Sequence, residues 1–454
     1  MSECMIAFDI AWRTITLWQP ADSSHYIACL HNGDRVRGAR RSPAPPPLPF
    51  PISTANTFFS FMTDDVATKR PRLCLSSISA GRRQGEGEET EEEEDSQPLL
   101  PGLPDHLAQH CLAHLPAPLL FSVCRSWRRL LYSPSFPPFL SIFALLSPSD
   151  DAGGDPVSFH SFDPIAARWA PLPAPPPHPP LRLLLLQHPS FISRSLSVQS
   201  VAVAGHLVVL AATTHRLVPA LPRPLVFHPA SRRWRLGPPL HAPRRWCAAG
   251  AADGAVYLVS GVGTDYNTDV ARSAERWDPA AGAIAGWERV AQLPDGRFSR
   301  EAVEAVASRG KLCMVNVRGR AAKQGTVYDI RADRWEEMPP GMLAGWTGPA
   351  ASAADDDDEG GGCIYVVDER SGALKAYDWY ADSWTTVAES ELLKGAAQMA
   401  VGGGRACVVC GDGRAMVVVD VAMSPARIWV VEPPEGKRAL AVHVLPRLSS
   451  SGSS

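Results

Sequence analysis

Trp277-Asp278-Pro279-Ala280-Ala281 stands early in the second half of the chain, and a further tryptophan, Trp287, follows it. The same order of residue types occurs six times: an aromatic or apolar residue, Asp or His, a short turn, and a tryptophan. The copies are Phe162-Asp163-Pro164…Trp169, Phe227-His228-Pro229…Trp234, Trp277-Asp278-Pro279…Trp287, Tyr328-Asp329…Trp335, Tyr377-Asp378…Trp384 and Val419-Asp420…Trp429. Successive closing tryptophans are 65, 53, 48, 49 and 45 residues apart. The sequence therefore contains an internal repeat.

A period of about 50 residues is typical of β-propellers, in which each repeat forms one blade of four strands. In the third repeat we expect strands at 247–252, 255–261, 274–279 and 287–290, with Asp253-Gly254 as the turn of a hairpin. The repeated Asp can accept backbone hydrogen bonds and so fix its turn. The repeated Trp supplies a large apolar surface between neighbouring blades.

The first repeat lacks an inner strand, because only 141–146, 157–162 and the segment at Trp169 suit strands. At the other end, residues 439–445 follow Trp429 without a repeat of their own. We expect this last strand to become the inner strand of the first blade, which closes the ring and removes exposed strand edges. The expected fold is an all-β propeller of six blades over residues 140–448.

A short helical segment is expected before the propeller, over residues 99–139. Leu107, Cys111 and Leu115 are spaced i, i+4, i+8 as on one face of a helix, with Asp105 as its N-cap. Prolines then separate a second helix at 119–124, and a third is expected at 126–132. Three short helices form a small core, so some of their apolar side chains must face a partner or the next domain.

This helical segment resembles an F-box. The matching residues are the opening Leu103-Pro104-Asp105, the central Leu115-Pro116 and the closing Val123-Cys124-Arg125-Ser126-Trp127-Arg128-Arg129-Leu130. With the repeats, residues 100–448 resemble the plant F-box/kelch-repeat proteins of the Skp-interacting type. One departure is the kelch double glycine, which is degraded to Ser260-Gly261-Val262-Gly263 in one blade and absent from most others.

The resemblance implies a substrate receptor of an SCF-type cullin–RING ubiquitin ligase, in which the F-box binds a Skp-type adaptor and the propeller recruits a target protein. Such a receptor performs no chemistry but raises the effective concentration of target lysines. Matching positions assign adaptor contact, or its support, to Leu103, Pro104, Leu107, Leu115, Pro116, Leu120, Val123, Cys124 and Trp127. The alternative for each is internal packing. Leu103 and Pro104 precede the first helix and are the expected direct contacts.

The resemblance also implies a target site on the face where the inner strands begin, since kelch platforms bind ligands with loops on one face. The candidates are Arg244, Arg245, Trp246, Arg300, Glu301 and Trp346. Exposed Arg and Trp are favoured interface anchors, and arginine suits an acidic motif. The alternative is ordinary surface charge.

Residues 1–98 and 449–454 have the composition of disordered tails. The N-terminal stretch contains a Pro-rich part, basic Lys69-Arg70-Pro71-Arg72, and an acidic run from Glu86 to Asp95. The basic patch predicts either nuclear import or only a solvated stretch, and the acidic run predicts a spacer. Because the first 60 residues differ in character from the rest, Met62 is an alternative start.

Bulk composition excludes several classes of function. The net charge is −3 and hydrophobic residues make up 45%, so we expect no nucleic-acid partner. Apolar runs are too short to span a membrane. The ten cysteines show no disulfide framework, which favours the nucleus, the cytoplasm or both.

No motif for catalysis or for a cofactor occurs, and we expect no metal. Cys407 and Cys410 lie in an expected strand and point to opposite faces, so they cannot easily share a metal. The acidic insertion at 355–362 lacks the alternating ligands of a calcium loop and is expected to be a mobile loop. Two rival functions are a kelch scaffold without a ligase and a propeller enzyme.

Overall fold

The structure, a computed structural model, describes residues 98–133, 135–149, 157–177, 181, 184, 198–281, 285–300, 302–318, 322–353 and 362–447. All of them belong to one compact unit, Gln97–Ser454. Several predicted regions lie outside the described residues: residues 1–97 of the N-terminal tail with the basic patch at 69–72, residues 355–361 of the acidic insertion, and the tail at 449–454.

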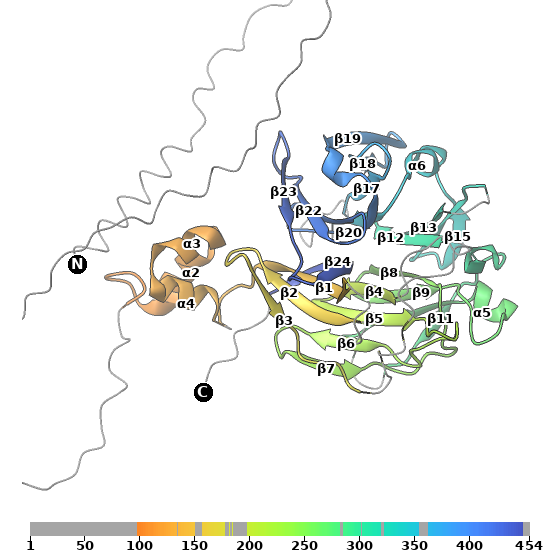
Figure 1. Cartoon of the computed structure of the whole chain (residues 1–454), viewed down its shortest axis with the longest axis horizontal. Helices are drawn as coiled ribbons and strands as arrows, with labels where there is room; N and C mark the ends of the chain where they lie inside the picture. The colour runs from red at the N-terminus through yellow and green to blue at the C-terminus, as the bar shows by residue number, and fades with distance from the viewer. Residues whose placement is uncertain are drawn as a thin grey trace, which may run out of the picture. The chain divides into compact units, whose positions relative to one another are not determined.

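Six four-stranded antiparallel sheets make up the larger part of the described residues (Figure 1). The first contains β24 (Lys437–Pro446), β1 (Leu140–Pro148), β2 (Ser158–Asp163) and β3 (Arg168–Pro171). The second contains β4 (Val198–Val203), β5 (His206–Ala212), β6 (Leu225–His228) and β7 (Arg233–Leu236). The third contains β8 (Ala248–Ala252), β9 (Ala255–Val259), β10 (Ala274–Trp277) and β11 (Glu288–Val290).

The remaining three sheets repeat the same order of strands. The fourth contains β12 (Ala302–Ser308), β13 (Lys311–Arg318), β14 (Gly325–Asp329) and β15 (Arg334–Glu337). The fifth contains β16 (Ala350–Ser352), β17 (Ile364–Asp368), β18 (Ala373–Asp378) and β19 (Ser383–Glu389). The sixth contains β20 (Ala396–Gly402), β21 (Arg405–Cys410), β22 (Ala415–Asp420) and β23 (Arg427–Val431). The prediction of a six-bladed propeller is confirmed.

The ring closes between the last strand and the first. β24 pairs antiparallel with β1, from Leu140 opposite Pro446 to Pro148 opposite Lys437. The first blade therefore takes its inner strand from the far end of the sequence, as the missing inner strand of the first repeat predicted.

The repeated polar residue holds the turn of each blade through its side chain. Asp163 Oδ1 accepts the backbone N–H groups of Ile165 at 2.8 Å and of Ala166 at 3.0 Å. Where the second repeat has histidine, His228 Nδ1 accepts the N–H of Ser231 at 3.1 Å. A ring nitrogen thus replaces the carboxylate oxygen, which explains how His can stand in one repeat where the other five have Asp.

The repeated tryptophan ties each blade to the one before it. In five blades the indole N–H donates to a carbonyl in the loop that leaves the preceding blade. The pairs are Trp169 with Glu432, Trp234 with Pro173, Trp287 with Pro238, Trp335 with Ala291, and Trp384 with Gly341 and Met342. Trp429 of the sixth blade differs, because its side chain is 39% exposed. Trp169, bonded to Glu432 at 2.8 Å, reinforces the closure of the ring.

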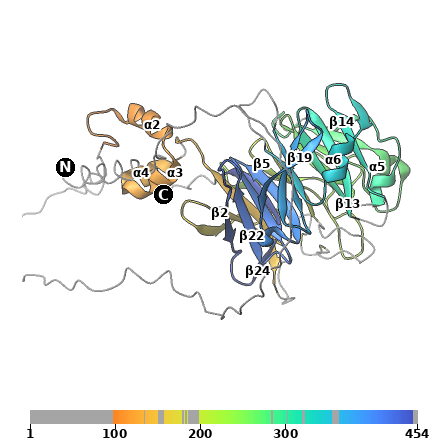
Figure 2. The ribbon, with the colours of Figure 1, turned by 90° about the horizontal axis from the view of Figure 1, so that it is seen from above.

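Three helices precede the propeller: α2 (Asp105–Ala113), α3 (Ala117–Val123) and α4 (Arg125–Leu131). Figure 2 shows them grouped as one cluster. Their shared core consists of Leu112, Leu120, Trp127, Leu130, Leu131 and Phe136. The prediction that Asp105 caps the first helix was wrong. Pro104 is the N-cap residue, and the Asp105 carboxylate accepts the N–H of Leu99 at 3.2 Å instead.

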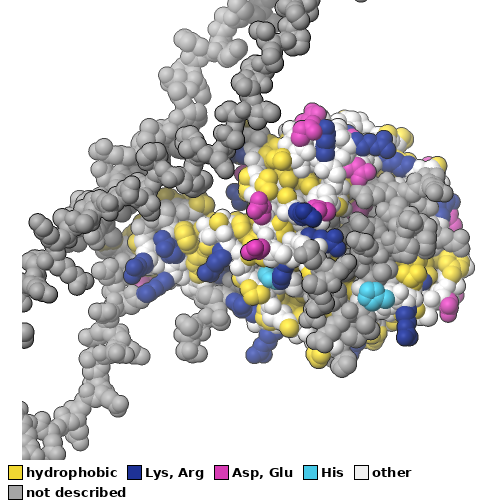
Figure 3. Space-filling model, viewed as in Figure 1, with side chains coloured by type: hydrophobic (Ala, Val, Ile, Leu, Met, Phe, Trp, Pro, Cys, Tyr) yellow, Lys and Arg dark blue, Asp and Glu magenta, His cyan; other side chains and the backbone are white. Residues whose placement is uncertain are grey.

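Four short elements lie in connections between strands: α5 (Thr268–Arg272), η2 (Arg297–Arg300), α6 (Pro340–Gly345) and η3 (Glu391–Leu393). On the face of the molecule drawn in Figure 3, basic and acidic side chains are interspersed over the propeller rather than gathered into one patch. This mixture agrees with the small net charge of the sequence.

Candidate adaptor and target surfaces

The start of α2 presents apolar side chains to solvent. Leu103 is 38% exposed and Leu107 is 45% exposed, while Pro104 between them is also exposed. On the opposite face of the same helix, Ala108 and Leu112 are buried in the helical core. Both faces of the helix therefore carry apolar residues, and the described residues cover only one of these faces.

Cys111 extends this exposed surface, since it lies one turn after Leu107 and is itself exposed. Cys111 was expected from the sequence as part of a helix face, but not as part of this exposed surface. Its i+4 spacing from Leu107 was the signal that places the two side chains side by side. We call Leu103, Pro104, Leu107 and Cys111 the apolar strip.

Two of the expected adaptor residues support the helices from within. Leu120 is fully buried and Trp127 is 8% exposed. The Trp127 indole N–H donates to the carbonyl of Leu99 at 2.8 Å, which fixes the segment that leads to the apolar strip. Cys124 caps α4, because its sulfur accepts the backbone N–H of Trp127 at 3.4 Å.

The other three expected residues lie at the edges of the helices. Leu115 and Val123 are half-buried against the helical core. Pro116 is exposed and forms the N-cap of α3. The nine residues thus divide into an exposed set at the start of α2 and a set that holds the helices in place.

On the expected target face, Arg244 is not a surface residue. It is fully buried, and its guanidinium forms an ion pair with Glu275, which is also buried. It also donates to Ser273 Oγ at 2.6 Å and to the carbonyl of Ser260 at 3.3 Å. The expectation of an exposed Arg244 is therefore corrected: the side chain turns inward to join β9 to β10.

Trp346 is also buried completely, so the expectation that it is exposed is corrected as well. It packs in the core formed by the fourth and fifth blades, with Met342 of α6 and Val366 of β17. An indole at this position serves to attach the α6 connection to the blades rather than to meet a target.

Arg245 and Trp246 form a tight turn before β8. The Arg245 guanidinium lies 3.9 Å from the centroid of the Trp246 ring, a cation–π stack. Arg245 is only 8% exposed, so the expectation that it lies at the surface is corrected too, and this burial lowers its pKa. Trp246 is half-buried and has a φ of 56°, a left-handed conformation that is rare for a bulky residue. The surrounding structure therefore holds this turn against its own backbone preference.

The degraded double glycine supports this turn from below. Arg245 and Val262 exchange two backbone hydrogen bonds of 2.9 Å. Gly261 between the strands has a φ of 107°, and a Cβ there would lie 2.9 Å from the carbonyl oxygen of Arg245. Glycine is thus required at 261 for both conformation and space.

The structure gives little information on the last two target candidates, Arg300 and Glu301. Arg300 ends η2, and nothing is described of its side chain; Glu301 lies outside the described residues. Tyr266 was not among the target candidates, but it is 49% exposed in the β9–β10 connection. This connection lies at the same end of the blade as the start of β8. An aromatic residue within the polar run Asp265-Tyr266-Asn267 was the sequence signal that could have identified it as a surface residue.

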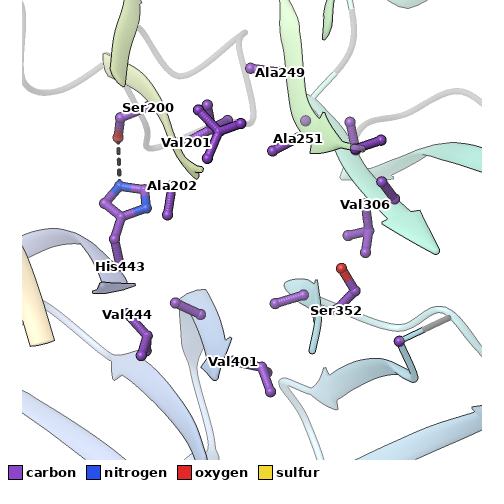
Figure 4. A pocket seen from close by; sticks show the side chains of 18 of the residues that line it. Ser200, Val201, Ala202, Ala249, Ala251, Val306, Ser352, Val401, His443 and Val444 are labelled. Atoms are coloured by element: carbon purple, nitrogen blue, oxygen red, sulfur yellow. Dashed lines mark hydrogen bonds between the residues drawn. The ribbon is translucent and has the colours of Figure 1, made fainter. Parts of the chain in front are cut away.

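The inner strands surround a central cavity of about 800 Å³ (Figure 4). Its walls carry mostly small side chains, among them Ala249, Ala251 and Ser352. Ser200 and His443 face each other in it, with 2.9 Å between Oγ and Nε2. Burial lowers the pKa of His443 to about 4, so the imidazole is neutral at pH 7. The pair thus forms a neutral hydrogen bond across the join between the first and second blades.

The thiols of Cys407 and Cys410 are also unreactive because of their surroundings. Burial raises the pKa of Cys407 to about 12 and that of Cys410 to about 11, so both thiols stay protonated at neutral pH. Within the described residues, no group of three or more His, Cys, Asp or Glu side chains is placed to hold a metal ion. No helix among those residues is long and apolar enough to cross a membrane.

Comparison with known proteins agrees with this geometry. None of the protein-family models matches the chain. The chain is 44% identical to the F-box/kelch-repeat protein SKIP25 of Arabidopsis thaliana over 391 residues, which cover 83% of this chain and 97% of that protein. It is 27% identical over 279 residues to the F-box protein AFR, covering 57% of this chain and 68% of AFR. It is 25% identical over 339 residues to the F-box/kelch-repeat protein SKIP4, covering 71% of this chain and 85% of SKIP4; both come from the same plant. A propeller behind three short helices, with this degree of identity over nearly the whole of a relative, shows that the chain belongs to the F-box/kelch-repeat family.

Proposed function

We propose that this chain is the substrate-recognition subunit of an SCF-type cullin–RING ubiquitin ligase. Its F-box binds a Skp-type adaptor, and its propeller recruits a target protein for ubiquitination. The family membership supports this proposal, as do the names SKIP25 and SKIP4, which belong to the Skp-interacting type. The subunit itself is non-catalytic and acts by holding the target near the ubiquitin-charged enzyme.

The apolar strip at the start of α2 is the observation that carries the adaptor half of the proposal. Leu103 and Leu107 each expose more than a third of their surface. A domain this small has little apolar area with which to stabilise its fold, so apolar side chains left in water are unfavourable. Burying one leucine side chain is worth about 1.5–3 kcal/mol. A partner helix laid on this strip would recover that energy twice, through Leu103 and Leu107.

For the target, we propose the face where the inner strands begin. Trp246 and the largely buried Arg245 remain proposed contacts there, and Arg300 and Glu301 are further proposed contacts, as the sequence suggested. Arg244 and Trp346 support this face from beneath, because both are buried. An acidic motif is the proposed partner chemistry, since a guanidinium stacked on an indole retains donors for a carboxylate.

The proposed place of action is the nucleus or the cytoplasm, where cysteines remain reduced. The seven cysteines among the described residues are all free thiols, which supports a reducing compartment.

Co-purification of the full-length chain with a plant Skp-type adaptor tests the adaptor half. We expect the wild type to bind stoichiometrically, and a Leu103→Ala/Pro104→Ala variant to bind at least about tenfold more weakly. Leu236→Ala is the matched control, because Leu236 is an exposed leucine (41%) on β7 of the propeller. A folded wild type that does not bind the adaptor would reject the ligase proposal and leave a kelch scaffold.

A further inference from the structure

The residue that follows the last strand, Arg447, reaches back into the F-box. Its backbone N–H continues the β24–β1 ladder by donating to the carbonyl of Phe139 at 2.9 Å. Its side chain leaves the propeller, and the whole residue is only 7% exposed. An arginine at a strand end normally extends into water, so its burial here requires an explanation.

The Arg447 guanidinium binds the C-terminal end of α4. It donates to three successive backbone carbonyls, those of Leu131 at 2.7 Å, Tyr132 at 3.3 Å and Ser133 at 2.9 Å. The last carbonyls of a helix have no partner within the helix and carry partial negative charge, so a cation there is favourable. Arg447 thus caps α4 from a position more than 300 residues away in sequence.

Two aromatic rings enclose the same guanidinium. Its central carbon lies 5.5 Å from the ring centroid of Tyr132 and 5.5 Å from that of Phe139, within the range of cation–π attraction. The two rings meet edge to face, with 5.7 Å between their centroids. The planar fork of arginine therefore fits a slot whose walls come from the segment between α4 and β1.

A second connection joins the same segment to the first blade. The Tyr132 hydroxyl donates to Asp163 Oδ2 at 2.7 Å, while Oδ1 of the same carboxylate holds the β2–β3 turn. Burial and this bond to Asp163 raise the pKa of Tyr132. Ile165, from the same turn, packs against the helical core. The repeat Asp of the first blade thus has a second role, which the other repeats do not require.

We propose that Arg447 is a positioning residue that locks the F-box to the first blade, so that adaptor and target are held at one fixed orientation. The lock depends on ring closure, because Arg447 reaches α4 only when β24 pairs with β1. Its existence does not depend on the ligase proposal; only its use in ubiquitin transfer rests on that proposed function.

Hydrogen exchange of the full-length chain tests the lock directly. In Arg447→Ala we expect the amides of Tyr132, Ser133 and Phe136 to exchange about tenfold faster, while the amides of β1 and β24 change little. Arg447→Lys should fall between the two, because an ammonium cannot span three carbonyls as a guanidinium does. The matched control is Arg438→Ala, an arginine of the same strand whose side chain bonds Ser147 instead. Unchanged exchange at 132–136 in a folded Arg447→Ala protein would overturn the proposal.

A functional readout uses the scarcity of lysine in this chain. Lysine occurs only at Lys69, Lys311, Lys323, Lys375, Lys394 and Lys437, so the F-box and the second and third blades have none, and the first blade has only Lys437 of β24. In a reconstituted ligase, mass spectrometry of the receptor's own ubiquitinated lysines should show a restricted pattern for wild type and Arg438→Ala. Arg447→Ala should bind the adaptor equally well but spread the modification over more of these lysines.

The two assays separate the two proposals. An Arg447→Ala pattern identical to wild type, with adaptor binding intact, would contradict the positioning role. Failure of the wild type to bind the adaptor would reject the ligase proposal, while the exchange measurement would still decide whether Arg447 locks the F-box.

Discussion

Two adjacent arginines show how much a single residue's direction matters. Arg244 is fully buried and forms an ion pair with Glu275 of the third blade, whereas Arg245 is 8% exposed and stacks on Trp246. Both precede the same strand, and both were expected at the surface. The difference follows from partners that are distant in sequence, since Ser273 and Glu275 lie about 30 positions further along the chain.

Removing one member of the buried pair should be costly. We expect Arg244→Ala to lower the free energy of unfolding by about 3–5 kcal/mol, because it leaves the Glu275 carboxylate buried without its main partner. Arg245→Ala should cost about 1 kcal/mol. Urea unfolding measures both. If the double variant Arg244→Leu/Glu275→Leu is as unstable as Arg244→Ala, the explanation by an uncompensated charge is wrong.

The titration of one side chain, His443, should make the stability of the protein depend on pH. Its pKa is about 4 when folded and near 6.5 when unfolded, so the unfolded state binds more protons between these values. Stability should therefore be complete above pH 6.5 and decline as the pH falls towards 4, by roughly 1–2 kcal/mol at pH 5. Urea midpoints at pH 7 and pH 5 measure this loss.

A glutamine variant is the comparison for that titration. His443→Gln can still hydrogen-bond Ser200 but cannot be protonated, so its loss of stability between pH 7 and pH 5 should be smaller than that of the wild type. His215→Gln, at an exposed position, should behave as wild type. An equal pH dependence in all three proteins would show that His443 is not responsible.

At the scale of the element, the fourth and fifth blades are each held to the preceding blade by one indole and one turn carboxylate. In the fifth blade, Trp384 donates to Gly341 and Met342 O, and Asp382 accepts the N–H groups of the same two residues. The Tyr377 hydroxyl completes the set with a 2.6 Å bond to Asp382.

This arrangement predicts unequal effects of the same substitution. Trp384→Phe keeps an aromatic ring but removes the N–H, so we expect a loss of about 1–2 kcal/mol. Trp429→Phe, in the blade where the tryptophan is 39% exposed, should cost less than about 0.5 kcal/mol. Thermal unfolding of the two variants, compared with wild type, distinguishes them. Equal losses would mean that the indole bonds do not hold the blades together.

The blades were predictable from the sequence because their determinants are local. Each Asp or His, its turn and its Trp lie within about ten residues of one another, and each hairpin has its own turn signal. The helices were predictable in number but not in their boundaries, since Pro104 rather than Asp105 is the cap. Ring closure could be predicted only because the first repeat was visibly one strand short.

What could not be predicted depends on distant contacts. The burial of Trp346 is caused by packing between two blades, and the short sequence around it contains no sign of this. The exposed leucines of α2 were expected from the F-box resemblance, whereas the role of Arg447 follows no pattern in the repeat. A side chain whose partners lie more than 300 residues away leaves no periodic signal.

At the scale of the whole molecule, the two ends of the propeller meet in one blade. β24 supplies the inner strand of the first sheet, Trp169 bonds Glu432 across the same join, and Arg447 continues into the helices. The helical domain and the propeller are therefore one mechanical unit in this structure rather than two domains on a free linker.

That closure also sets an order of events during synthesis. The F-box leaves the ribosome before the propeller, but its lock and the first blade require β24, so neither can be completed until all six blades have been synthesised. A chain that ended before β24 would hold an unfinished ring. Completion of the first blade thus reports that translation reached the final strand.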